Sequence, residues 1–198
     1  MNITAGEQGL KTLLQRAIAL DSQALARVQQ LPDDQLDIFV TTPFNVLASR
    51  RITGTLNEAP GTFSATAFLD GTQLGDLTAA WPGALPPHDG WQELDVLPVD
   101  VVHQLADQGR DLARQFSGPM GPPKSLLDQT VIEVSNESAV AAVSMRLIFA
   151  CTSLGLIPGI GARPDIPRHL RVSKCGRWTR IDAPFGSVYQ NQGLGLLV

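Results

Sequence analysis

The chain has 198 residues, of which 43% are hydrophobic, and it carries 15 Lys and Arg against 19 Asp and Glu, for a net charge of −4. This length suits one ordinary domain, which can bury a sufficient core without disulfides or metals. Its 2 cysteines, Cys151 and Cys175, argue against a disulfide scaffold. The first nine residues lack the basic and apolar regions of a signal peptide, so we expect a cytoplasmic protein.

The first half of the chain predicts helix and then strands. Leu10, Leu13, Leu14, Ala17 and Ile18 have helical spacing, and Asp21-Ser22 is predicted to cap a second helical segment over residues 23–30. Alternation of apolar residues then predicts strands over residues 36–40, 44–56 and 63–69. Short turns join these strands, so we expect an antiparallel meander near residues 36–69.

The middle of the chain predicts two main helices. Residues 72–81 suit a short helix, and residues 91–97 a strand. An amphipathic helix is predicted near residues 98–116, with Gly109 marking a close packing contact because glycine is otherwise unfavourable there. A loop rich in Gly and Pro follows at residues 117–123, then a strand at 130–134. Ser135 is predicted to cap an apolar helix near residues 138–155, which we expect to be the most buried element.

Residues 138–160 contain a single charged residue, Arg146, and are long enough to cross a bilayer. Four Ser and Thr residues dilute the stretch, and Gly155 and Pro158 end it early. Arg146 would also lie near the bilayer centre. We therefore favour a buried helix over a membrane span.

A second meander is predicted near residues 168–191, with strands at 170–174, 178–182 and 187–190. The predicted fold is α+β, a single domain over residues 1–198, with the two meanders packed against the helices near 98–116 and 138–155. Each meander contains a turn with Pro followed by Phe and then Asn45 or Gly186. Either the two β units arose by duplication or hairpins reuse the same turn chemistry, and we favour the second explanation.

No catalytic, cofactor-binding or metal-binding residue is predicted. The sequence lacks a nucleophile elbow, a phosphate-binding Gly-Lys-Ser/Thr loop and a His-Glu-x-x-His helix. The glycine-rich segment at residues 156–163 follows a helix instead of opening one, so we interpret it as a connector. Carboxylate pairs such as Asp107 and Asp111 have polar neighbours and are expected to be solvated.

The most specific signal is a basic segment in an acidic chain. Residues 163–180 contain six Lys and Arg and one acidic residue, whereas residues 1–162 contain 9 basic and 17 acidic residues. The candidate interaction patch consists of Arg171, Lys174, Arg177 and Arg180. Alternation along the strands keeps these four from sharing one face, so we expect a small basic tip at the turn formed by Cys175 and Gly176.

Three explanations of the basic segment remain open. It can be a solvated edge that prevents aggregation, a contact for an acidic protein or a second copy of the chain, or a nucleic-acid surface. The low isoelectric point of about 5.3 and the shortage of stacking aromatics argue against nucleic acid.

Four segments together resemble an uncharacterised family of conserved proteins from actinobacteria: VLASRR at residues 46–51, residues 91–105, LLD at 126–128, and GRW at 176–178 with FGSVY at 185–189. The resemblance implies a cytosolic bacterial protein and carries no activity, cofactor or site residue. For function we favour a non-enzymatic binding or regulatory protein with an acidic body and a basic C-terminal hairpin. The alternative is a small-molecule enzyme or ligand-binding protein whose site residues cannot be identified from the sequence.

Overall fold

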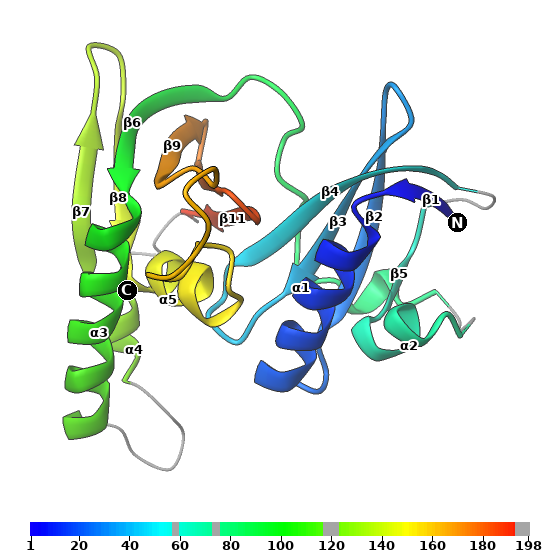
Figure 1. The fold of residues 1–198 in the computed structure, drawn as a ribbon, viewed down its shortest axis with the longest axis horizontal. Helices are drawn as coiled ribbons and strands as arrows, with labels where there is room; N and C mark the ends of the chain where they lie inside the picture. Colours follow the sequence, from blue (N-terminus) through cyan, green and yellow to red (C-terminus); the bar gives the residue numbers. More distant parts are fainter. Residues whose placement is uncertain (57–59, 73–75, 117–122, 193–198) are drawn as a thin grey trace. The chain divides into compact units, whose positions relative to one another are not determined.

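The computed structural model describes residues 1–56, 60–72, 76–116 and 123–192. The chain divides into two compact units, Met1–Leu85 and Pro86–Val198. Each contains antiparallel strands and helices, so the predicted α+β fold is confirmed (Figure 1). The single domain stays a prediction, and so does the preference for reused turn chemistry over a duplication of the β units. Among the described residues, no helix is long and apolar enough to span a bilayer.

The first unit is an antiparallel sheet with helix α1 against one face (Figure 1). Its elements are β1 (Asn2–Ala5), α1 (Glu7–Leu20), β2 (Leu25–Leu31), β3 (Gln35–Thr41), β4 (Leu47–Thr55), β5 (Thr62–Ser64), α2 (Ala65–Asp70) and the 3-10 turn η1 (Thr78–Ala80). The strand order is β5-β2-β3-β4, and β1 pairs with β4. Leu10, Leu13 and Leu14 of α1 are buried, as the helical spacing predicts.

Two predicted elements of this unit are wrong. The segment predicted as a second helix, residues 23–30, forms most of β2, in which Ala26 and Val28 are buried at alternate positions and pair with β3. Asp21 accepts a hydrogen bond from the Gln23 backbone N–H and so forms a turn, not a helix cap. The third predicted strand ends at Ser64, and α2 follows until Gly71, whose φ of 66° closes the helix.

The expected helix over residues 72–81 is reduced, in its described part, to η1. Residues 73–75 lie outside the described residues, as do residues 117–122 of the predicted glycine- and proline-rich loop.

The second unit combines a four-strand sheet, a separate hairpin and two main helices. Its elements are β6 (Gln92–Pro98), α3 (Val99–Phe116), α4 (Lys124–Leu127), β7 (Thr130–Ser135), β8 (Val140–Ser144), α5 (Met145–Ser153), β9 (His169–Cys175), β10 (Trp178–Ala183) and β11 (Gly186–Asn191). Within this unit the sheet order is β11-β10-β9-β6, and β7 pairs with β8. The predicted helix at 98–116 and the C-terminal strands are confirmed.

The apolar helix begins at Met145 instead of near residue 138. Residues Val140–Ser144 form β8, which pairs with β7, and Ser135 ends β7 instead of capping a helix. The segment is apolar because strand and helix are both largely buried, and apolar content alone does not separate the two. All seven residues from Met145 to Cys151 are buried, which agrees with the expected central position of this helix.

Helices α3 and α5 approach closely at Gly109. A Cβ atom at this position would lie 2.8 Å from Met145 Sδ and 2.9 Å from Phe149 Cζ. The predicted close contact at Gly109 is therefore confirmed, and it explains a glycine inside an 18-residue helix.

Candidate functional site

The C-terminal strands have one apolar face and one polar face. Val172, Ile181 and Val188 are opposite one another in the register of β9, β10 and β11, and each is fully buried. Directly paired residues point to the same side of a sheet. On the other side, Arg180 pairs with Ser173 and Tyr189. Asp182 pairs there with Arg171 and Ser187, so this polar face brings two of the four predicted patch residues, Arg171 and Arg180, together.

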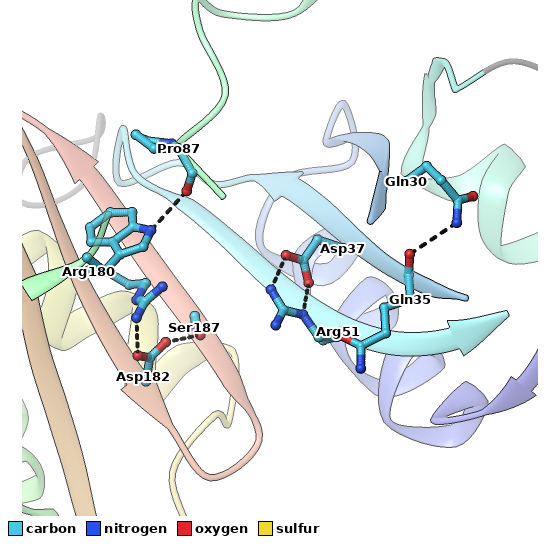
Figure 2. A network of polar contacts seen from close by, with 9 residues as sticks. Gln30, Gln35, Asp37, Arg51, Pro87, Arg180, Asp182 and Ser187 are labelled. Atoms are coloured by element: carbon cyan, nitrogen blue, oxygen red, sulfur yellow. Dashed lines mark hydrogen bonds and ion pairs between the residues drawn. The ribbon is translucent and has the colours of Figure 1, made fainter. Parts of the chain in front are cut away.

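Arg180 lies in a compact cluster with Asp182 and Trp91. Its Nη2 is 2.9 Å from Asp182 Oδ2, and Asp182 also accepts a hydrogen bond of 2.6 Å from Ser187 Oγ (Figure 2). The Arg180 guanidinium carbon lies 4.4 Å from the centroid of the Trp91 ring. The side chains of Arg180 and Asp182 are only 20% and 18% exposed. Arg180 is therefore held and neutralised inside the fold.

Trp91 is positioned by contacts on both of its sides. Its Nε1 donates a hydrogen bond of 2.9 Å to the Pro87 carbonyl, and its ring meets Tyr189 edge-on with centroids 5.9 Å apart. These contacts hold the indole ring in place against the Arg180 guanidinium. Sequence reasoning missed this cluster because Trp91 and Arg180 are 89 positions apart.

Lys174 and Arg177 lie near the hairpin turn. Lys174 pairs with Thr179, and its Nζ donates a hydrogen bond of 2.5 Å to the Val140 carbonyl of β8. Arg177 is exposed in the turn, next to Gly176 with its φ of 54°. Arg171 is also exposed. Of the four predicted residues, Arg171 and Arg177 therefore offer accessible charge, and the role of the patch in binding stays a prediction.

The remaining arginines of the basic segment support the loop after α5. Arg163 forms an ion pair with Asp165, with Nε 3.0 Å from Oδ1. Arg168 donates hydrogen bonds to the carbonyls of Gly159, Ile160 and Ala162 at 3.0, 3.1 and 3.3 Å. Ile160 itself is 90% exposed. In the sequence, the feature that distinguishes Ile160 is its place as an aliphatic residue between Gly159 and Gly161.

The first unit carries a comparable charge pair on its own sheet. Arg51 donates two hydrogen bonds to Asp37, with Nε 2.8 Å from Oδ1 and Nη2 2.6 Å from Oδ2 (Figure 2). Asp37 is 4% exposed, and the two residues are direct partners between β3 and β4. A bidentate pair of this kind fixes strand register and neutralises a buried carboxylate.

The shifted pKa values of this chain are caused by hydrogen bonds or by burial. A hydrogen bond from Thr78 lowers the pKa of Asp76, and one from Arg146 lowers the pKa of Asp128. Burial lowers the pKa of Arg50 and raises the pKa of the Cys151 thiol to about 12. Within the described residues, no three or more His, Cys, Asp or Glu side chains gather as metal ligands would.

Solved structures of bacterial sliding clamps resemble this chain. The DNA polymerase III subunit beta of Pseudomonas aeruginosa matches with a TM-score of 0.58 at 12% identity, over 96% of this chain and 64% of that one. The Caulobacter crescentus DNA polymerase sliding clamp matches with a TM-score of 0.56 at 10% identity, over 96% and 65%. The Helicobacter pylori beta clamp, bound to a DNA ligase peptide, matches with a TM-score of 0.53 at 12% identity, over 96% and 66%.

This chain thus spans just under two thirds of the length of these clamps. At such low identity the likeness establishes the fold alone. No curated protein matches the chain.

Two family models match adjacent parts of the sequence. Residues 4–91 match the model described as Domain of unknown function (DUF8010). Residues 86–195 match Domain of unknown function (DUF8185), which accounts for more than half of the chain. The boundary between the two matches lies close to the boundary between the two compact units. The chain therefore belongs to the family described as Domain of unknown function (DUF8185) and has the fold of the bacterial sliding clamps.

Proposed function

We propose that this chain is a non-enzymatic protein that binds protein partners through surfaces of a sliding-clamp-like fold. The observation that carries the proposal is the likeness to sliding clamps over 96% of the chain. One of these clamps is described as bound to a DNA ligase peptide and another as a subunit of DNA polymerase III. Because the Helicobacter pylori clamp is described with a bound peptide of another protein, the shared fold supports a partner-binding role here by analogy.

The docking surface that we propose is the exposed part of the basic hairpin, Arg171 and Arg177. Arg180 and Lys174 are engaged within the fold by Asp182 and by the Val140 carbonyl. Guanidinium groups bind carboxylates in a bidentate manner, so an acidic protein segment is the partner with matching chemistry. We further infer that the protein acts in the cytoplasm of an actinobacterium, as the family resemblance implies.

Nucleic acid is the class of partner that competes with an acidic protein in this proposal. The expectation against nucleic acid is not supported by the comparisons, because the similar structures are proteins of DNA polymerases. Charge still favours a protein partner, since residues 1–162 hold 17 acidic against 9 basic residues. The two arginines of α3 are moreover paired within the helix, Arg110 with Asp107 and Arg114 with Asp111. Phosphate binding requires clustered cations that remain accessible.

No specific observation favours the enzyme alternative. The carboxylates with lowered pKa, Asp76 and Asp128, are hydrogen-bonded to Thr78 and Arg146. A general acid or base usually needs a pKa shifted toward neutrality, and these pKa values move in the opposite direction.

The test compares two variants that remove the same charge from different places. Arg171→Ser with Arg177→Ser removes the proposed surface, and Lys11→Ser with Arg16→Ser removes two exposed cations of α1. Each protein is immobilised and exposed to native cytosol, to an acidic decapeptide and to duplex DNA, at low and at physiological salt. We expect acidic proteins and the peptide to be retained by the wild type and the α1 variant, more weakly at higher salt, and lost from the hairpin variant.

Two outcomes would contradict the proposal. Equal retention by the hairpin variant would exclude Arg171 and Arg177 as the surface. Duplex DNA bound at physiological salt and released by the hairpin substitutions would show that the partner class is nucleic acid.

A further inference from the structure

Asp182 lies between two arginines on the polar face of the C-terminal sheet. Arg180 precedes it by two positions on β10, and side chains two positions apart on a strand point to the same face. Arg171 of β9 is the direct partner of Asp182 in the strand register. Directly paired residues have Cβ atoms about 4.5–5.5 Å apart, which is close enough for an ion pair. One carboxylate therefore has two guanidinium groups within reach.

Only Arg180 binds this carboxylate. Its Nη2 lies 2.9 Å from Asp182 Oδ2, and Ser187 Oγ donates a hydrogen bond of 2.6 Å to Asp182 Oδ1, so each carboxylate oxygen has a donor (Figure 2). Arg171 is exposed. Among the residues that the structure describes, its side chain has no partner in a hydrogen bond or an ion pair.

The surroundings of the two arginines explain why Asp182 pairs with Arg180. The Arg180 guanidinium carbon lies 4.4 Å from the centroid of the Trp91 ring, and the Arg180 side chain is only 20% exposed. A guanidinium with so little water around it needs both the aromatic ring and the carboxylate. Arg171 is solvated, so an ion pair with Asp182 would replace contacts with water and would add little stability.

Loss of Arg180 would change the state of Arg171. The Asp182 side chain is 18% exposed, and a largely buried carboxylate without a cation is unfavourable. The other guanidinium in register is that of Arg171, whose long side chain has no described partner to give up. Arg171 would then pair with Asp182, and its charge would no longer be available to a carboxylate of another protein.

We propose that Arg180 is a positioning residue of the docking surface, because it neutralises Asp182 and so keeps Arg171 available to an acidic partner. This inference rests on the proposed function, since it concerns the same surface. Trp91 takes part by holding the Arg180 guanidinium in place. A carboxylate of the partner then takes the position at Arg171 that Asp182 would otherwise fill.

Fluorescence anisotropy of the labelled acidic decapeptide at low salt tests the role of Arg180. We expect Arg180→Met to bind the peptide about two- to fivefold more weakly than the wild type, which corresponds to the loss of one partly exposed ion pair. Arg180→Lys keeps a cation beside Asp182 and should retain most of the affinity. Arg180→Met with Asp182→Asn should recover it, because no carboxylate is left to bind Arg171. Thermal melts verify folding, and Arg180→Gln replaces Arg180→Met if the latter is unfolded.

An Arg171→Ser background separates this mechanism from a general loss of positive charge. Without Arg171, Asp182 has no guanidinium to withdraw from the surface, so Arg180→Met should weaken peptide binding no further. A general effect of charge does not depend on Arg171 and would persist in this background.

Three results would overturn the inference: wild-type affinity in Arg180→Met, a loss of the same size in the Arg171→Ser background, or no recovery on addition of Asp182→Asn. In each case, release of the peptide by Arg171→Ser with Arg177→Ser would leave the proposed function standing. A wild type that does not bind the peptide at all would refute both proposals.

Discussion

Substitution of Gly109 by Ala sets two effects of known sign against each other. Alanine in place of an interior helical glycine stabilises a helix by about 1 kcal/mol. The new Cβ would, however, lie 2.8 Å from Met145 Sδ, 2.9 Å from Met145 Cε and 2.9 Å from Phe149 Cζ. Distances below 3.0 Å require movement, and both neighbours are buried, at 3% and 5% exposure. Overpacking of this kind costs about 1–3 kcal/mol, so we expect a net loss of about 1 kcal/mol.

Urea unfolding followed by circular dichroism measures this change. The Met145 tail can rotate, whereas the Phe149 ring is rigid, so most of the expected loss comes from separation of α3 and α5. The control is the same substitution in a Phe149→Ala background, where the rigid contact at 2.9 Å is absent and Gly109→Ala should cost less or become stabilising. Stabilisation by about 1 kcal/mol in the wild-type background would refute the close packing of the two helices.

Three further predictions concern single groups. Asp128→Asn should cost about 1–3 kcal/mol, discounted for a half-exposed carboxylate, because it removes the carboxylate that forms an ion pair with the buried Arg146 guanidinium. The pKa of Asp128 is lowered in the folded protein, so this difference in stability from the wild type should be present above about pH 4 and vanish as the pH falls through the folded pKa. Urea unfolding at a series of decreasing pH values measures the difference. A difference that stays constant with pH would contradict the prediction. Burial raises the pKa of Cys151 to about 12, so iodoacetamide should label it only after denaturation, and rapid native labelling seen by mass spectrometry would be inconsistent with that burial. Lys174→Ser with Arg177→Ser should change stability by no more than about 0.5 kcal/mol in thermal melts, and a larger loss would mean that the Lys174 contact with Val140 supports β8.

The sequence determined the elements whose pattern is long and regular. Helix α3 was predicted with its boundaries and its tight glycine because its apolar positions repeat over five turns. Strands β9, β10 and β11 were predicted because alternation and turn residues agree over each short segment. The α+β fold follows from these elements together. Local patterns of this length depend only on neighbouring residues, so they can be read without the rest of the chain.

The tertiary structure decided whether each short element is a helix or a strand, and which cations of the basic segment are paired and which are exposed. Strand β2, helix α2 and strand β8 have apolar residues that suit either period over a few positions, and pairing with distant strands or packing against other helices selects one of them. The sequence presented the basic segment as one run of cations. Register and packing place Arg180 beneath Trp91 and against Asp182, tie Lys174 to Val140, and leave Arg171 and Arg177 exposed. These partners come from distant parts of the chain or from cross-strand register, so only the fold could assign them.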